Sequence, residues 1–191
     1  MSAVNRDTPP SPTSPWVVPG EYTVALTVGG KSHTQPLTVK MDPRVKMSRA
    51  ELEEQLTLSQ QLADVRAGLE PIRKIFDPLV EQLTKLRDQS LPKNVEEKLN
   101  ALNSKLRELG PPNPRPGATP SLYALDSAKD LFQEIQSVDA VPTDRIKAAV
   151  NDVRTQGTEL TKHWKEIVAQ EMPALDQELQ VAGLPRLSLA K

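Results

Sequence analysis

The side chains best suited to metal or acid–base chemistry are scattered along this sequence. His163 lies four residues after Glu159 and three before Glu166, the spacings at which helical side chains are neighbours. A zinc site needs further nitrogen or sulfur ligands, but no second histidine stands within a helical turn and no His-Glu-x-x-His spacing occurs. We therefore interpret His163 as part of a solvated ion-pair surface.

Two acidic pairs invite comparison with the carboxylates of glycosidases. Glu53-Glu54 and Glu96-Glu97 each place two carboxylates together in sequence. Adjacent helix positions point in different directions, and no aromatic residues accompany the pairs as a sugar cleft would require. The pairs are typical of a solvated helix surface. The other histidine, His33, falls on the apolar side of a predicted strand, where we expect it to pack.

Two further motifs have ordinary structural explanations. Gly29-Gly30 lacks the spacing and the following helix of a phosphate-binding loop, so we interpret it as a turn. The run Lys40 to Arg44, "KMDPR", places Asp before Pro where a strand gives way to a helix, which is common turn chemistry. The chain has no cysteine, which excludes disulfides, thiol catalysis and zinc–thiolate sites. The sequence thus predicts no catalytic, cofactor-binding or metal-binding residue, and no cofactor.

Composition narrows the classes of partner. The 191 residues include 24 basic and 25 acidic ones, for a net charge of −1, so no overall field attracts nucleic acid. Trp, Tyr and Phe number two each, which is few for stacking bases. No apolar run is long enough to span a membrane. The N-terminus, "MSAVNRDTPPSPTSPW", does not read as a secretory signal, because no basic start precedes an apolar stretch.

The elements that would position any site begin with a hairpin. Residues 1–19 contain five prolines and predict an extended segment. In residues 20–41, apolar and small polar residues alternate before Gly29-Gly30, the period of a half-buried strand followed by a two-residue turn. The predicted register pairs Val28 with Lys31, Leu26 with His33, Val24 with Gln35 and Tyr22 with Leu37. Two strands cannot bury a core alone, so the helices either cover this apolar face or leave it exposed.

A helical period occupies residues 46–183. Ser48 and Glu51 fit a capping box, and apolar residues then recur at spacings of three and four. We expect kinks or a break near residues 70 and 77, because Pro71 and Pro78 interrupt the pattern. Three more amphipathic helices follow, with a Pro-rich loop at 110–120, a cap at Thr143, a kink at Pro173 and a tail at 184–191. The predicted fold class is mainly α: an N-terminal β-hairpin, as part of a β-sandwich, then an antiparallel bundle of about four helices.

The long apolar seam of the first helix allows two interpretations. Packing within the chain is the default for such a seam, and a self-associating or partner-binding surface is the alternative. The seam comprises Leu58, Leu62, Val65, Leu69, Ile72, Phe76, Leu79, Leu83 and Leu86.

The hairpin and its exit also resemble a known family. The run "PWVVPGEYTVALTVGGKSHTQPLTVKMDPRV" is similar to the C-terminal region of bacterial sortilin-like proteins with neuraminidase-type (BNR) repeats, exported β-propeller proteins often labelled glycosyl hydrolases. The tail, from "VPTDRIKAAV" to "EMPALDQELQVAGLPRL", resembles the last helix of that family. The matching residues of the hairpin region are Pro19, Gly20, Tyr22, Thr23, Val24, Leu26, Val28, Gly30, Lys31, Gln35, Pro36, Leu37, Val39, Asp42, Pro43 and Arg44. In the tail they are Pro142, Thr143, Pro173, Ala174, Leu175, Gly183, Leu184 and Pro185.

The resemblance implies a role without catalysis. In that family such strands finish an immunoglobulin-like β-sandwich, a helical segment follows, and the propeller that would hold an active site has no counterpart in these residues. The chain departs from the pattern at Gly29, His33, Pro71 and Pro78. The expected function is a non-catalytic accessory or assembly module, with the propeller or sandwich region of a parent protein as partner and an extracytoplasmic location. The alternatives are an autonomous helical interaction or dimerisation module and, last, a glycan-processing enzyme.

Overall fold

The computed structural model describes residues 13–110 and 122–188, and within them a hairpin precedes packed helices. Strands β1 (Gly20–Val28) and β2 (Lys31–Val39) form a two-stranded antiparallel sheet. Helices α1 (Arg49–Arg87), α2 (Lys93–Leu109), α3 (Tyr123–Gln136) and α4 (Asp144–Glu166) follow. A π-helical turn, η1 (Ile167–Glu171), joins α4 to α5 (Met172–Val181) as one helical path. The predicted fold class is confirmed: a hairpin, then four helices packed together.

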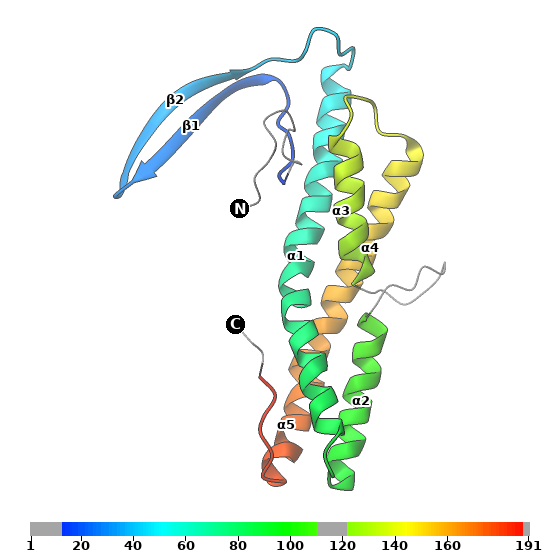
Figure 1. Cartoon of the computed structure of the whole chain (residues 1–191). Coiled ribbons are helices and arrows are strands. Elements are labelled where there is room, and N and C mark those ends of the chain that lie inside the picture. The colour runs from blue at the N-terminus through cyan, green and yellow to red at the C-terminus, as the bar shows by residue number, and fades with distance from the viewer. Residues whose placement is uncertain (1–12, 111–121, 189–191) are drawn as a thin grey trace, which may run out of the picture.

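The helices lie in three rows. Helix α1 runs the length of the bundle and α4 with α5 returns beside it, while α2 and α3 follow one another along the third row (Figure 1). The N–H of Leu122 donates to the carbonyl of Leu109 at 3.0 Å, so α2 ends beside the start of α3. The predicted 110–120 loop falls, after Gly110, on residues outside the described ones.

Side-chain caps fix two of the helix starts. Ser48 accepts from the backbone N–H of Glu51, whose carboxylate accepts from the N–H and hydroxyl of Ser48, which completes the predicted capping box. These hydrogen bonds, the backbone one first, lower the pKa of Glu51. Thr143 caps α4 by accepting from the N–H of Ile146, as its sequence position predicted.

The apolar seam of α1 is buried inside the bundle. Each of its nine residues is buried except Val65, which is half-buried. Leu69 and the seam residues after it pack with α2, α4 and α5, whereas Leu58 and Leu62 pack with α3 and α4 in a second cluster. Val65 packs against both clusters. The default interpretation, packing within the chain, therefore describes the seam.

Of the kinks or break expected near residues 70 and 77, the break does not occur. Helix α1 continues through Pro71 and Pro78 from Arg49 to Arg87. Each proline leaves the carbonyl four residues earlier without its helical donor, and those carbonyls belong to Ala67 and Lys74, which are both exposed. Water can satisfy them, so the helix does not need to end. At Pro173 the chain adjusts instead: the N–H of Met172 donates to Ile167, five residues earlier, in the π turn just before the proline.

A bidentate ion pair joins α1 to α3. The two terminal nitrogens of Arg73 donate to the two carboxylate oxygens of Asp126 at 2.7 and 3.0 Å. These hydrogen bonds lower the pKa of Asp126 below its ordinary value of 3.8 and raise that of Arg73. A carboxylate with a lowered pKa contributes stability that is present above the ordinary value and is lost as the pH falls through the lowered one.

We expect Asp126→Asn to lower the stability of the protein near neutral pH and to have no effect in strong acid. The loss should be no more than about 1 kcal/mol, because both side chains are about a third or more exposed. The gap between the urea unfolding free energies of the variant and the unaltered chain should close as the pH falls through and below 3.8. Asp130→Asn, at an exposed position of the same helix, is the control. A gap that stays constant with pH would contradict this role for the ion pair.

Candidate interaction surface

The β-hairpin has one apolar and one hydroxyl-rich face. The pairs of the observed register are those predicted, from Val28 with Lys31 to Tyr22 with Leu37. Gly29 and Gly30 have φ values of 56° and 78°, which suit a two-residue turn of the type that joins twisted strands. We define the apolar hairpin face as Tyr22, Val24, Leu26, Val28, Leu37 and Val39, and three polar residues of β2 lie on the same side: Lys31, His33 and Gln35. The other face carries Thr23, Ala25, Thr27, Ser32, Thr34, Pro36, Thr38 and Glu21.

The apolar hairpin face is not covered by the helices. Figure 1 shows the hairpin arching away from the bundle. Leu26 is 62% exposed and Val28 63%, and Val24 and Leu37 are about half exposed. Of the two outcomes that the sequence left open, the exposed face is therefore the one observed. The expectation that His33 packs is wrong, because His33 is exposed together with the rest of this uncovered face.

A hydrogen bond joins the base of the hairpin to the bundle, and local contacts order the segments that flank the hairpin. The N–H of Trp16 donates to Oε1 of Gln136 in α3 at 2.8 Å, and the hydroxyl of Tyr22 donates to the carbonyl of Val18 at 2.6 Å. On the other side, Asp42 accepts from the backbone N–H and the guanidinium of Arg44 in the turn that leads to α1. These hydrogen bonds, that of the guanidinium first, lower the pKa of Asp42. The "KMDPR" run is thus turn chemistry, as interpreted.

A buried polar network behind Trp16 was missed by the sequence analysis. Nε2 of Gln136 donates to the hydroxyl of Ser59, which donates to the carbonyl of Gln55. Nε2 of Gln55 donates to the carbonyls of Ile135 and Val138, where α3 ends. All three polar residues of the network are at least nine-tenths buried. Gln55 stands three residues before Leu58, so it extends the seam by one step, and a polar residue at a seam position is the signal that could have found it.

A pocket of about 430 Å³ adjoins the hairpin base. Val39, the last residue of the apolar hairpin face, lines this base pocket together with Met41 and Leu52. Trp16 and Val17 also line it, and Gln55 and Gln136 are among its polar groups. The apolar surface therefore continues from the hairpin onto the first turns of the bundle.

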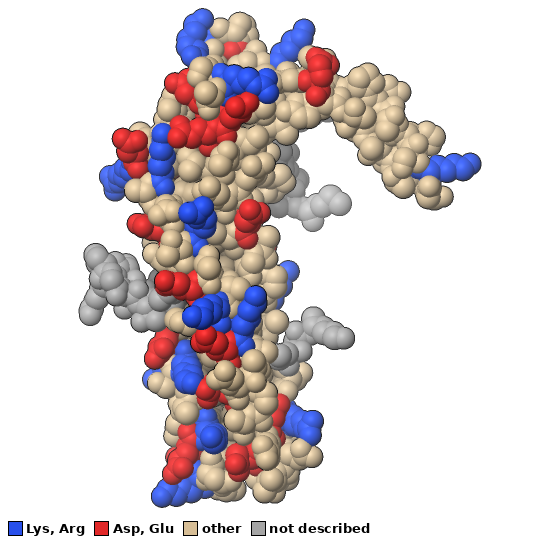
Figure 2. Space-filling view, turned by 180° about the vertical axis from the view of Figure 1, so that it is seen from behind, with Lys and Arg blue, Asp and Glu red and all other residues tan. Residues whose placement is uncertain are grey.

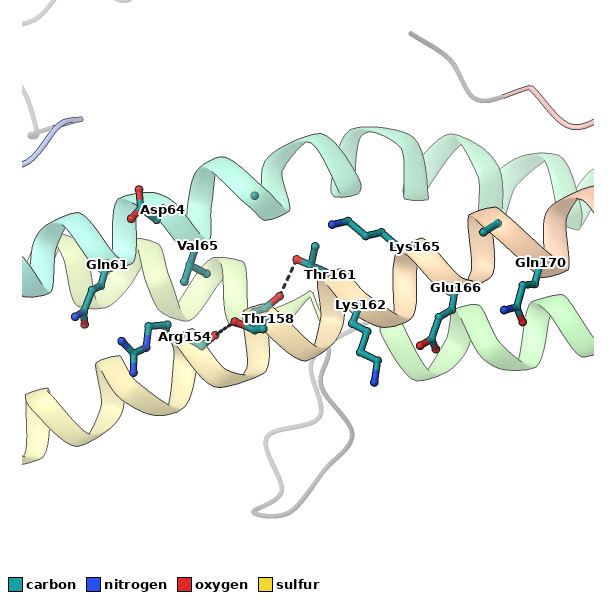
Figure 3. Close-up of a pocket in the computed structure, with 13 residues that line it drawn as sticks. Gln61, Asp64, Val65, Arg154, Thr158, Thr161, Lys162, Lys165, Glu166 and Gln170 are labelled. Atoms are coloured by element: carbon teal, nitrogen blue, oxygen red, sulfur yellow. Dashed lines mark hydrogen bonds between the residues drawn. The ribbon is translucent and has the colours of Figure 1, made fainter.

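A groove of about 770 Å³ lies between α1 and α4. Figure 3 shows its side chains, which come from α1 on one side and from α4 with η1 on the other. The hydroxyl of Thr158 donates to the carbonyl of Arg154 and that of Thr161 to Gly157, so both are engaged within the helix. Among the residues that the structure describes, neither hydroxyl has a histidine or carboxylate partner that would make it a nucleophile.

The side chains that the sequence singled out do not converge. Glu53 pairs with Arg49 at 2.8 Å and Glu54 with Lys147 at 2.6 Å, and Glu97 lies 4.0 Å from Lys93, so these carboxylates belong to exposed or half-exposed ion pairs. His163 is half-buried and, within the described residues, makes no ion pair with Glu159 or Glu166, which corrects that detail of its interpretation. Residues 13–110 and 122–188 hold no group of three or more His, Cys, Asp and Glu placed to bind a metal.

The charged side chains on the face seen in Figure 2 do not form a patch of one sign that would favour a charged ligand. Figure 2 shows acidic and basic side chains interspersed along the bundle, whereas the hairpin is almost free of them except for a basic side chain at its tip. Among the described residues, no helix is long and apolar enough to cross a membrane. The exposed apolar surface of the hairpin and its base pocket is therefore the feature most suited to binding another polypeptide.

The chain was also compared with known proteins. Neither the family models, nor the curated proteins, nor the solved structures include a match to it. The functional interpretation consequently depends on the geometry of the hairpin and on the resemblance of the residues named above.

Proposed function

We propose that this chain is a non-catalytic assembly module whose hairpin completes a β-sandwich with strands from the preceding region of a longer, exported, propeller-bearing protein. The single observation that carries the proposal is the uncovered apolar hairpin face. Half to two-thirds of each of Val24, Leu26, Val28 and Leu37 is exposed, on a sheet whose other face bears hydroxyl groups. A sheet with this alternation is suited to packing one face on a second sheet.

The attachment of the hairpin supports the same proposal. Trp16, in the segment before β1, donates to Gln136 of α3, and the Asp42–Arg44 hydrogen bonds order the turn between β2 and α1. The 39-residue helix α1 then extends away from that base as a rigid support. A module of this kind needs no catalytic residue of its own, because its work is to bind and position neighbouring domains.

The test uses the absence of native cysteine. Leu26→Cys places a thiol on the apolar hairpin face, and Thr27→Cys places one on the hydroxyl face as the matched control. Each variant is prepared alone and joined to the polypeptide encoded immediately before it, and the rate of reaction with a maleimide is measured. We expect joining to slow Cys-directed labelling at position 26 by about tenfold or more, and at position 27 by no more than about twofold. Equal rates at position 26 in the two forms would overturn the proposed function.

A further inference from the structure

The two edges of the hairpin are not equivalent as partners for another strand. In a hairpin with a two-residue turn, the residues that flank the turn exchange both backbone hydrogen bonds, and such pairs then alternate with pairs that exchange none. Counting from Val28 and Lys31, the backbone groups of Glu21, Thr23, Ala25 and Thr27 point outward from β1. Those of Ser32, Thr34, Pro36 and Thr38 point outward from β2.

Pro36 makes the β2 edge a poor partner for another strand. Pro36 is opposite Thr23, so the position at which it lacks an N–H faces away from β1. An additional strand beside β2 would miss a hydrogen bond there and would meet the proline ring. By contrast, each outward position of β1 from Glu21 to Thr27 keeps its N–H and its carbonyl. Within residues 13–110 and 122–188, no hydrogen bond engages these backbone groups.

We propose that the strand completing the sheet pairs with β1 and leaves β2 as the outer edge. The occupant is a strand of about seven residues that alternates apolar and polar side chains, because its length must match Glu21–Thr27 and its apolar side must continue the apolar hairpin face. This inference rests on the proposed function, which supplies the polypeptide from which the strand comes: the region that precedes this chain in the longer protein.

A second copy of the chain satisfies the geometry less well. Two β1 strands could pair across a two-fold axis perpendicular to the sheet, which would keep both apolar faces on the same side. The resulting four-stranded sheet would still expose Val24, Leu26 and Leu37 of both copies to water. A strand that belongs to a larger body can bring the covering layer with it. The base pocket, lined by Val39 and Met41 next to that face, widens the apolar surface that such a body would cover.

Residue-resolved amide hydrogen exchange tests the choice of edge. The amides of Thr23, Ala25 and Thr34 all point outward, so we expect all three to exchange rapidly in the chain alone. In the chain joined to the preceding polypeptide, the amides of Thr23 and Ala25 should slow by about tenfold or more, while that of Thr34 stays unchanged. Ala25→Pro should remove the slowing at Thr23, and the matched change on the β2 edge, Thr34→Pro, should leave it intact.

The outcomes separate the two proposals. Slowing at Thr34 without slowing at Thr23 and Ala25 would overturn the choice of β1. So would a joined Ala25→Pro protein in which exchange at Thr23 is still slowed as much as without the substitution. Either result could accompany protection of position 26 from maleimide, in which case the proposed function would survive. Slowing at Thr23 that appears in the chain alone and grows with its concentration would identify a second copy as the occupant and overturn the present assignment.

Discussion

Phe132→Ala is expected to destabilise the protein by about 3–5 kcal/mol, the largest loss that we predict for one substitution. Phe132 is fully buried in the cluster that joins α1, α3 and α4, and it is the bulkiest of the side chains less than 2% exposed. Its ring also lies under the guanidinium of Arg66, whose carbon is 5.3 Å from the ring centre. Truncation would remove the packing of the ring and its contact with Arg66, and it would leave a cavity that the surrounding side chains can fill only in part.

Urea unfolding followed by circular dichroism measures this loss, with the slope of the free energy against urea concentration checked for constancy. Val181→Ala is the control, because Val181 is 78% exposed, and it should change the unfolding free energy by no more than about 0.5 kcal/mol. A loss below about 1 kcal/mol for Phe132→Ala would show that this part of the bundle can repack around the missing ring.

Gln55→Leu is expected to cost about 1–3 kcal/mol and to loosen the end of α3. The side chain of Gln55 is replaced by one of similar size, so packing changes little, but the carbonyls of Ile135 and Val138 lose their shared donor at 2.7 and 3.0 Å. The carbonyl of Ile135 is the costlier of the two to leave unpaired, because the bond that it accepts is buried. The loosening should extend to Gln136, which holds Trp16 at the base of the hairpin.

The matched control is Gln60→Leu, the same change at an exposed position of the same helix. Chemical unfolding gives the energetic cost. When each tryptophan is replaced by Phe in turn, the fluorescence of Trp16 reports the hairpin base and that of Trp164 reports the core cluster that contains Phe76. We expect the Trp16 signal to change in folded Gln55→Leu and the Trp164 signal to stay as it was. Equal stability of the two Gln→Leu variants would contradict the prediction that the hydrogen bonds of Gln55 stabilise the protein.

The parts of the fold that follow local rules could be predicted from the sequence. Alternation around Gly29-Gly30 determined the hairpin register, and Ser48 with Glu51 and Thr143 marked the helix starts, because these signals act over a few residues. The continuity of α1 through Pro71 and Pro78 could not be predicted, since it depends on which carbonyls face water after packing. The three-row arrangement also depends on tertiary contact: α2 and α3 align because Leu122 meets Leu109.

The candidate surface was predictable in its pattern and unpredictable in its exposure. The residues of the apolar hairpin face could be named from their period. Whether the helices cover them depends on how much apolar helix surface remains after the helices have packed on one another. The apolar stripes of the helices bury one another, and the hairpin does not pack on them. The link from Trp16 to Gln136 joins residues 120 positions apart and has no local signal.

The position of Val65 between the two core clusters has a consequence for how the molecule opens. Val65 contacts both clusters, and directly opposite it stands Gly157, where an added Cβ would lie 3.1 Å from a Val65 methyl carbon. Among the described residues, Val65 is the one hydrophobic side chain that packs against both clusters. Cooperative unfolding spreads through shared apolar contacts, so a junction this small lets the cluster beside the hairpin fluctuate as a separate foldon. A sheet could then dock and settle at one end while the far end keeps its full protection.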